Sequence, residues 1–373
     1  MRIGLSTTTL EPSLNKGHLD GIGVYTDHLL NGFLARGHHV EGRSFPKFLK
    51  SRAAYPLVTG KPFSGSFISL AGMAMMTGGR FRTDPHVDIF HVTDYRVVPM
   101  RCPVVASLHD AIPMKYPHLA SSRFRTVKNY IQRSVAQYAD RVITLSHYTV
   151  PDIVEYYGIP ESRISVVPCG VDSSWLAPAA EKEVESALEN RGLVPGYFLF
   201  VGTIQPRKNI ERILDAYTRL AESVRRERKL VIVGRAGWRC DALVARLGEL
   251  MQAGQVAWLN DVQTEVELRH LYAGAGVFVF PSIFEGFGIP ILEAFASGVP
   301  VVTSNTTSLP EVSGGAAIEI NPESVDDILS AMELLAVDNA ERRKRIEAGR
   351  KRVASFTWSA TVEKTLDVYR QLL

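Results

Sequence analysis

The stretch 277–300, VFVFPSIFEGFGIPILEAFASGVP, constrains the fold of this chain more than any other, because it reads as a complete strand–loop–helix unit. The apolar run Val277–Phe280 is typical of a buried strand. Pro290 suits the first turn of a helix, where its missing N–H costs nothing, and Gly298 followed by Pro300 favours the helix end. The pattern therefore predicts a strand that leads through a short loop into a helix, as in parallel α/β proteins.

The loop of this unit carries groups that suit a phosphorylated ligand. Glu285 lies just before the predicted helix, and Glu293 follows eight residues later in its first turns. Gly286 and Gly288, on either side of Phe287, leave backbone N–H groups open to close approach, and a helix N-terminus favours a phosphate. A solvated glutamate beside a capping glutamate is the structural alternative. The convergence of these groups on one strand end favours a binding site.

This stretch resembles the Glu-x7-Glu signature of retaining GT-B glycosyltransferases, specifically those of the large family 4. In that family the first glutamate contacts hydroxyls of the transferred sugar, and the second contacts the ribose of the nucleotide. The resemblance implies these roles for Glu285 and Glu293. It also implies donor contacts for the loop 286–288.

Length and composition set the outer limits. At 373 residues, with 46% hydrophobic and 22% charged residues, the chain suits two domains of a soluble globular protein. The start of the chain shows no apolar leader, and its most apolar uncharged stretch, 67–76, is shorter than the roughly 20 residues that cross a bilayer. Three cysteines without metal-like spacing indicate a reducing compartment, so we expect a cytoplasmic protein. The net charge of +3 gives no reason to expect a nucleic-acid partner.

Short apolar runs alternate with helical patterns along the whole chain, which predicts parallel sheets. The candidate strands are Arg2–Ser6, His39–Arg43, Ile89–Thr93, Val104–Leu108, Arg141–Leu145, Ile164–Val167, Tyr197–Val201, Lys229–Val233, Val256–Leu259, Val277–Phe280, Val299–Thr303 and Ala317–Ile320. Each half of the chain thus has enough strands for one doubly wound sheet. We expect an α/β protein of GT-B type, with two Rossmann-like domains facing across a cleft.

The expected domains follow from these strands. Residues 1–172 form an N-terminal, acceptor-binding Rossmann-like domain, and the polar, Glu-rich stretch 173–195 is a linker. Residues 196–356 form a C-terminal, nucleotide-sugar-binding domain. The family resemblance implies that the last helix, 357–373, crosses back to the first domain.

Two segments of the first half leave alternatives open. The loop 7–23 ends with Gly21 and Gly23, just before a predicted helix. It is either a flexible turn or a loop that binds a phosphate or the acceptor. The family has a glycine-rich loop here near the diphosphate, which implies donor contacts for both glycines. The segment 43–82 mixes basic and apolar residues. It is either an irregular insertion or a segment that binds acceptor or membrane, since basic and aromatic residues suit an anionic interface.

A histidine follows one predicted strand of the first half. His109 comes directly after Val104–Leu108, so its side chain can reach the cleft, although a lone histidine is more often structural. The family has a functional histidine at this place. The run Ser107–Pro113 resembles mannosyltransferase members, which implies a catalytic role for His109.

The first loop of the second half supplies two cations. Gly202 follows a strand, and Arg207 and Lys208 lie at the turn into the next helix, which Asn209 can cap. A solvated basic pair is the structural alternative, but two cations at a helix start are what a diphosphate leaving group needs. The family carries an arginine and a lysine in this loop. Because Thr203 stands where many members have the arginine, we assign that role to Arg207.

The nucleotide base and the metal requirement complete the expected site. In the family the base lies near the end of a later strand, which implies a donor contact for Val262. The chain contains no Asp-x-Asp, so no obvious carboxylate pair holds a metal at the diphosphate. We therefore expect neither metal nor cofactor, with the nucleotide sugar as co-substrate.

The expected function is a retaining, metal-independent hexosyltransferase. It would move mannose from GDP-mannose to a glycan or polyprenyl-linked acceptor in surface polysaccharide or lipopolysaccharide synthesis. The family resemblance implies a front-face mechanism that needs no dedicated nucleophile from the enzyme. A dTDP- or UDP-sugar, for example a rhamnosyl donor, is the alternative, and so is a nucleotide-sugar epimerase of similar build. A dinucleotide oxidoreductase needs Gly-x-Gly-x-x-Gly after its first strand, and neither Gly4 nor Gly202 begins that motif.

Overall fold

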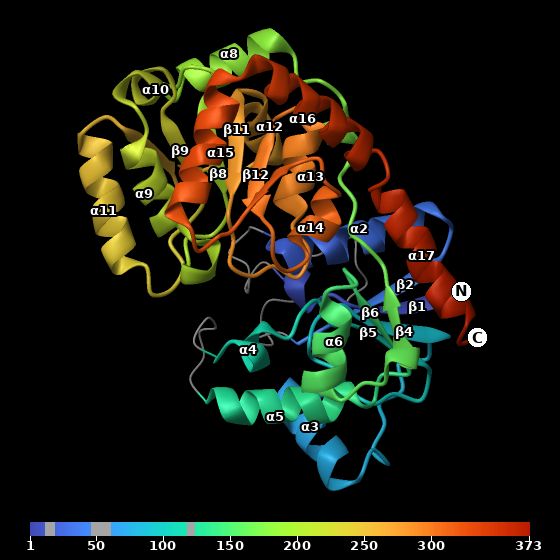
Figure 1. The fold of residues 1–373 in the computed structure, drawn as a ribbon. Coiled ribbons are helices and arrows are strands. Elements are labelled where there is room, and N and C mark those ends of the chain that lie inside the picture. Colours follow the sequence, from blue (N-terminus) through green and yellow to red (C-terminus); the bar gives the residue numbers. More distant parts are fainter. Residues whose placement is uncertain (12–18, 46–60, 118–123) are drawn as a thin grey trace. The chain divides into compact units, whose positions relative to one another are not determined.

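The computed structural model describes residues 1–11, 19–45, 61–117 and 124–373. The chain divides into two compact units, which Figure 1 draws as ribbons. Unit 1 comprises Met1–Cys169 together with Trp358–Leu373, and unit 2 comprises Gly170–Thr357.

The described part of unit 1 contains a parallel sheet of seven strands, in the order β3-β2-β1-β4-β5-β6-β7. Its strands are β1 (Arg2–Ser6), β2 (His39–Ser44), β3 (Lys61–Pro62), β4 (Ile89–Val92), β5 (Val104–Ser107), β6 (Arg141–Thr144) and β7 (Ile164–Val166). Its α-helices are α2 (Gly21–Ala35), α3 (Phe67–Met76), α4 (Ile112–Lys115), α5 (Arg125–Ala136), α6 (Thr149–Asp152) and α17 (Trp358–Arg370). The strand order reverses beside β1, as in doubly wound sheets.

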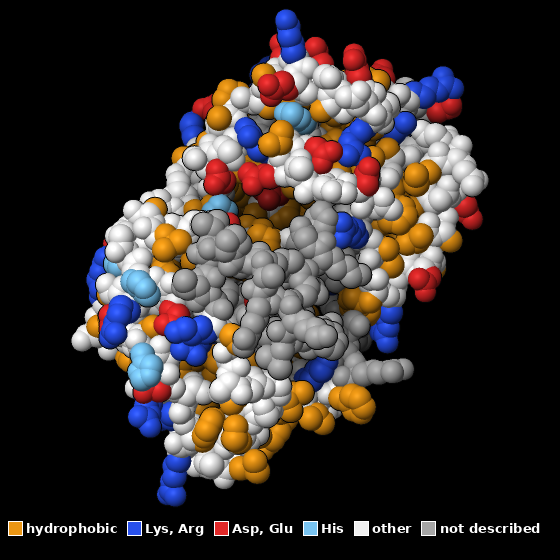
Figure 2. Space-filling model, turned by 180° about the vertical axis from the view of Figure 1, so that it is seen from behind, with side chains coloured by type: hydrophobic (Ala, Val, Ile, Leu, Met, Phe, Trp, Pro, Cys, Tyr) orange, Lys and Arg blue, Asp and Glu red, His pale blue; other side chains and the backbone are white. Residues whose placement is uncertain are grey.

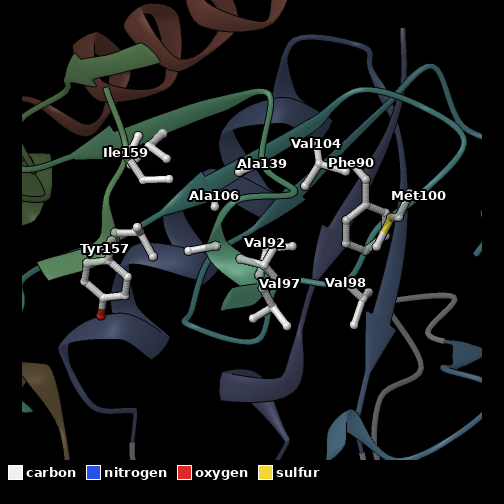
Figure 3. Close-up of a cluster of buried hydrophobic side chains, with 14 of the residues drawn as sticks. Phe90, Val92, Val97, Val98, Met100, Val104, Ala106, Ala139, Tyr157 and Ile159 are labelled. Atoms are coloured by element: carbon white, nitrogen blue, oxygen red, sulfur yellow. The ribbon is translucent and has the colours of Figure 1, made fainter. Parts of the chain in front are cut away.

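The central strands β4 and β5 are buried along their whole length, as expected where helices cover both faces of a parallel sheet. Phe90 and Val92 of β4 and Val104 of β5 are almost fully buried, and they pack with Val98 and Tyr157 in one core cluster. Figure 3 shows these side chains meeting between the strands and the segments that cover them. The core thus holds the carboxyl ends of β4 and β5 at one edge of the sheet.

Unit 2, whose residues are all described, contains a parallel sheet of six strands in the order β10-β9-β8-β11-β12-β13. Its strands are β8 (Tyr197–Val201), β9 (Leu230–Val233), β10 (Val256–Leu259), β11 (Ala275–Phe280), β12 (Val301–Ser304) and β13 (Ile318–Ile320). Its α-helices are α7 (Ser173–Leu176), α8 (Glu181–Glu189), α9 (Ile210–Arg219), α10 (Glu222–Glu227), α11 (Asp241–Gln252), α12 (Glu265–Ala273), α13 (Ile289–Ala296), α14 (Leu309–Ser313), α15 (Val325–Val337) and α16 (Asn339–Val353).

The predicted fold class, two parallel α/β domains, is confirmed. Each of the twelve predicted strands is present, with ends within two residues of the expected ones. The structure adds β3, whose two residues are too few to produce an apolar pattern.

The structure divides the chain differently from the prediction at 173–195. This stretch contains α7 and α8 and groups with unit 2, where α8 packs against α12. Arg191, just after α8, pairs with Asp261 at 3.0 Å and with Glu267 at 3.1 Å. The polar composition of this stretch therefore reflects an exposed helix face, and the expected linker is instead a folded part of unit 2.

Candidate active site

The site is built at the carboxyl ends of β8 and β11, which are neighbours in the sheet of unit 2. The loop 202–209 follows β8, and the loop 281–288 follows β11. Because both strands are parallel, both loops emerge at the same edge. The backbone N–H of Ile283 donates to the carbonyl of Arg207 at 2.8 Å, which joins the two loops directly.

Three charged side chains from these loops form one buried cluster. The Nζ of Lys208 lies 2.6 Å from Oε1 of Glu285, and Nη1 of Arg207 lies 2.8 Å from Oε2. Glu285 and Lys208 are each only 8% exposed. Arg207 also donates to the carbonyl of Phe284 at 3.0 Å, and the Lys208 ammonium lies 4.6 Å from the centre of the Phe280 ring. All three charges belong to the predicted site, but no sequence pattern indicates that they pair.

The charges of this cluster set the ionisation of its members. Burial alone raises the pKa of Glu285, but the charges of Arg207 and Lys208 outweigh it and lower that pKa to about 2. Burial lowers the pKa of Lys208 to about 8, although the Glu285 charge opposes this. At neutral pH the cluster therefore holds one carboxylate between two cations, and the site carries a net positive charge.

Asn209 is positioned before α9 as predicted, but it does not cap that helix. Its φ is +62°, in the left-handed region, and its side chain makes no cap hydrogen bond. Its Nδ2 instead donates to the carbonyls of Pro281 at 2.9 Å and Pro322 at 2.7 Å, and its Oδ1 accepts from Arg212 at 2.9 Å. Asn209 thus ties the β8 loop to the β11 loop, and the capping prediction is wrong because tertiary partners outcompete the local one.

The loop before α13 is held by the side chain of Ser308. The hydroxyl of Ser308 lies 2.9 Å from the carbonyl of Glu285 and 2.8 Å from that of Phe287, and it donates to this pair. Gly288 has a φ of +119°, and a Cβ there would lie 2.8 Å from a Leu309 methyl group, so only glycine fits. Both contacts orient the loop at the start of α13.

Glu293 lies on α13, one turn into the helix, and has its own partner. The Tyr272 hydroxyl donates to Oε2 of Glu293 at 2.9 Å. Burial raises the pKa of Glu293 to about 7, and this hydrogen bond only partly offsets the effect. The Glu293 charge in turn acts on Lys208. Tyr272 gave no signal in the sequence because it lies on α12, 21 residues away in the chain.

The remaining predicted donor contacts of unit 2 lie along the same sheet edge. Gly202 has a φ of +150°, and a Cβ at this position would lie 3.5 Å from Cε of Lys208. Since that distance is an ordinary van der Waals contact, the positive φ rather than a lack of space favours glycine here. Val262 is half-buried in the loop after β10. The strand β10 is the outermost strand of this sheet, and β9 separates it from β8. The loop of Val262 therefore follows a strand that is not next to β8.

The glycines of unit 1 lie elsewhere than expected. Gly21 and Gly23 belong to the first turn of α2, which begins earlier than the predicted helix. The side chain of Asp20 caps this helix by accepting from the N–H of Gly23 at 2.8 Å. The prediction of a glycine loop that ends at Gly23 is therefore wrong. The cap formed by Asp20 explains the earlier start.

His109 follows β5 in unit 1, as predicted. Its Nε2 lies 2.9 Å from the carbonyl of Thr93. A carbonyl only accepts, so Nε2 carries the proton, and burial lowers the pKa of this histidine. His109 is therefore a neutral imidazole whose Nδ1 holds a lone pair. The ring of Tyr25 meets the imidazole edge-on, with centroids 5.1 Å apart.

Within 1–11, 19–45, 61–117 and 124–373, no group of three or more His, Cys, Asp or Glu side chains is arranged to hold a metal ion. Among the helices of the described residues, none combines the length and the apolar character that crossing a bilayer requires.

Comparison with known proteins identifies the family. Residues 182–352 match the family model described as "Glycosyl transferases group 1", and residues 19–175 match "Glycosyltransferase Family 4". The two models together cover most of the chain. The protein therefore belongs to the group 1/family 4 glycosyltransferases.

Curated relatives and solved structures agree with this assignment. The O-antigen chain mannosyltransferase B of Escherichia coli is 34% identical over 247 residues, or 65% of this chain and 64% of that protein. The chain thus spans slightly less than two thirds of that relative. The MMP alpha-(1->4)-mannosyltransferase of Mycolicibacterium hassiacum is 26% identical and aligns over 96% of both chains. The Anabaena protein HepE in complex with UDP-glucose has a TM-score of 0.76 at 15% identity over 100% of both chains, which shows the GT-B fold.

Proposed function

We propose that this protein is a retaining hexosyltransferase that moves mannose from GDP-mannose to a glycan or polyprenyl-linked acceptor. The cluster of Arg207, Lys208 and Glu285 at the start of α13 is the observation that carries this proposal. Support for mannose comes from the two relatives, both of which are mannosyltransferases. Support for a nucleotide sugar comes from the UDP-glucose complex of similar fold.

The leaving diphosphate is the group that this cluster suits best. Negative charge grows on the diphosphate as the bond to the sugar breaks, and two positioned cations stabilise that growth. Glu285 holds both cations in place before any ligand arrives, so their reorganisation at the moment of reaction is small. The N-terminus of α13 adds backbone N–H groups at the same point. Because the protein supplies this charge, we expect the reaction to need no divalent metal.

The two glutamates take separate tasks in this proposal. Glu285 is ionised at neutral pH and can accept hydrogen bonds from hydroxyls of the transferred sugar. Glu293, oriented by Tyr272, can accept both ribose hydroxyls once its carboxyl group has lost its proton. The loop 286–288, Gly202 and Val262 would complete the donor contacts.

In unit 1 we propose a catalytic role for His109. Its neutral imidazole presents Nδ1 as a hydrogen-bond acceptor, which suits a sugar hydroxyl. No nucleophile from the protein is assigned, since a front-face displacement needs none. Gly21 and Gly23, at the N-terminus of α2, remain proposed contacts of the donor.

The acceptor side of the proposal includes an anionic membrane surface. The helices α3 and α5 of unit 1 pack against each other, and their side chains include no aspartate or glutamate. Large apolar side chains on or next to these helices are 57–81% exposed: Ile68, Met76, Phe124, Val127 and Tyr130. In the rear view of Figure 2, hydrophobic side chains gather at the end of unit 1 where Figure 1 places α3.

Basic residues accompany these apolar side chains. Arg125, Lys128 and Arg133 lie on α5, and both kinds of group favour binding to anionic lipid. We therefore propose that the protein binds peripherally to the inner surface of the cell membrane, where a polyprenyl-linked acceptor is found. The helix α3 belongs to the segment 43–82, for which the sequence left acceptor or membrane binding open. Residues 46–60 of that segment lie outside the described residues.

A binding screen tests the donor. Thermal unfolding is followed with GDP, UDP and dTDP, each at the same concentration, and then with the matching sugar donors. We expect GDP and GDP-mannose to raise the Tm most. Stabilisation by UDP or dTDP with no response to GDP would favour the alternative donors. Release of free nucleoside diphosphate only when an acceptor is supplied separates a transferase from an epimerase.

A further inference from the structure

The helix α17 follows unit 2 in the chain but packs in unit 1, against α2. Its contact with the core includes fully buried polar groups. The Tyr369 hydroxyl lies 2.7 Å from Nδ1 of His91, and Nε2 of His91 lies 2.8 Å from the hydroxyl of Ser107. The Ser107 hydroxyl lies 2.9 Å from that of Tyr25. All four side chains are at most 1% exposed, so none can exchange its partner for bulk water.

The two hydrogen bonds of His91 run in opposite senses. Burial lowers the pKa of His91 to about 3, so its imidazole is neutral, and one ring nitrogen carries the proton while the other holds a lone pair. His91 therefore donates to one of the hydroxyls of Tyr369 and Ser107 and accepts from the other.

The hydrogen bonds run from Tyr369 on α17 through His91 on β4 and Ser107 on β5 to Tyr25 on α2. We call these four side chains the polar circuit. Because all four are buried, removing the hydroxyl at either end leaves a buried polar group without its hydrogen bond.

The polar circuit meets the proposed active site at two points. Ser107 is the last residue of β5, two positions before His109 in the chain. The Tyr25 ring lies edge-on to the His109 imidazole at an interplanar angle of 86°, which is a favourable geometry for aromatic rings. Trp358, the first residue of α17, also contacts the Tyr25 ring, with centroids 6.3 Å apart. Tyr25 is thus held by both ends of α17.

We infer that Tyr25 is a positioning residue for His109 and that α17, through the polar circuit, fixes the orientation of the His109 imidazole. The carbonyl of Thr93 accepts a hydrogen bond from Nε2 of His109, and the ring of Tyr25 packs against the imidazole and blocks its rotation. The C-terminal helix is therefore part of the site of unit 1 rather than only a structural support. The consequence for activity rests on the proposed function, whereas the consequence for the imidazole does not.

The test follows the His109 side chain directly by nitrogen-15 NMR of the full-length protein, with assignment by a His109→Gln variant. Tyr25→Phe keeps the ring but cuts the circuit, Tyr25→Leu removes the edge contact, and Tyr369→Phe cuts the circuit three hydrogen bonds away. Tyr138→Phe is the matched control, since its hydroxyl donates to the Ala74 carbonyl at 3.2 Å elsewhere in unit 1.

We expect the three circuit variants to change the imidazole nitrogen signals of His109, because the ring is no longer held in one orientation, most strongly in Tyr25→Leu, and the control to leave them unchanged. Transfer assays should show kcat reduced about tenfold to a hundredfold, with unchanged affinity for the nucleotide. A His109 signal that stays as in the wild type in all three folded variants would overturn the inference. A shifted signal with normal kcat supports the positioning and instead contradicts the catalytic role of His109.

Discussion

Lys208 and Glu285, 77 residues apart in the chain, form an ion pair of 2.6 Å in the interior of unit 2. Arg207 completes the pair as a second cation at 2.8 Å. Because both lysine and glutamate are almost fully buried, neither charge is stable there alone. The same arrangement that keeps the site folded without ligand also keeps two cations where a diphosphate would bind.

Removing the carboxylate should therefore destabilise the ligand-free protein. Glu285→Gln leaves Lys208 and Arg207 buried without a counter-ion, and breaking such a pair costs about 3–5 kcal/mol. An added nucleoside diphosphate should raise the Tm of this variant at least as much as that of the wild type, because its phosphates bring negative charge to the two cations. Thermal unfolding with and without GDP measures this. A smaller rise in the variant would mean that the phosphates bind elsewhere.

Removing a cation should weaken the transition state. Lys208→Ala should lower kcat/KM. The expected decrease corresponds to a loss of at least about 2 kcal/mol of transition-state stabilisation, which is the scale of one lost donor to developing charge. Arg207→Ala should act in the same direction. Lys229→Ala serves as the control, because this lysine of unit 2 immediately precedes the strand β9 and so lies away from the carboxyl ends of the strands. Unchanged kcat/KM in a folded Lys208→Ala protein would remove this residue from the site.

The two glutamates should be separable by kinetics. Glu285→Gln should depress kcat, because contacts to the sugar strengthen toward the transition state, and should leave the affinity for bare nucleotide within a few-fold. Glu293→Gln should weaken the bare nucleotide itself. Calorimetry with GDP beside steady-state kinetics distinguishes them. The reverse pattern would exchange the two assignments.

The pH dependence should reflect Glu293 and Lys208. The carboxyl group of Glu293 has its pKa raised by burial to about 7, so its acceptor form, and with it nucleotide affinity, should increase between pH 6 and 8. The pKa of Lys208 is lowered to about 8, so kcat/KM should fall above that pH as the ammonium is lost. Tyr272→Phe removes a bond that lowers the Glu293 pKa, and the rising limb should move to higher pH. A profile without either limb would contradict this account.

The contribution of Glu293 to folding stability should change with pH in the direction opposite to its effect on nucleotide affinity. The folded-state pKa of about 7 exceeds the ordinary 4.5, so the folded protein holds this proton more tightly. The contribution of Glu293 to the free energy of unfolding is therefore present below about pH 4.5 and is lost as pH rises toward 7. Comparing the unfolding of wild type and Glu293→Gln across this range isolates it, since the glutamine does not titrate.

Membrane binding should depend on the exposed face of α5. Val127→Ser and Tyr130→Ser should reduce co-sedimentation with vesicles that contain phosphatidylglycerol, because exposed apolar side chains insert at the interface. Val194→Ser and Val337→Ser are matched controls, being 76% and 67% exposed in unit 2. Binding should be weaker to pure phosphatidylcholine and should fall as salt is added. Equal loss in the control variants would argue against this surface.

Chelation tests the role of the protein cations. Activity should persist in EDTA, because Arg207 and Lys208 supply the charge that a metal bridging the phosphates would otherwise provide. The measurement is the rate of nucleotide release with a supplied acceptor, before and after dialysis against the chelator. Full loss that Mg²⁺ or Mn²⁺ restores would contradict the proposal.

The sequence by itself determined the strands, their order in the chain and the loops that carry the site. Buried parallel strands are recognisable because both of their faces are covered, which leaves uninterrupted apolar runs such as Val277–Phe280. Glu285, Glu293, Arg207 and Lys208 were found because each lies at a strand end or a helix start, and these are local features. The same reasoning predicted a linker at 173–195, where a polar helix of a folded unit has a similar composition.

Only the tertiary structure decided which of these groups touch. The pairing of Lys208 with Glu285, the hydroxyl of Ser308 beneath the loop, and the contact of Tyr272 with Glu293 join residues 21–77 positions apart. Tyr369 and His91 are 278 positions apart. Local propensity acts over a few residues, whereas such contacts depend on how the whole chain closes around its cores, so no short pattern encodes them. Asn209 shows the difference in one residue, because the pattern of a cap is present but more distant carbonyls bind its side chain.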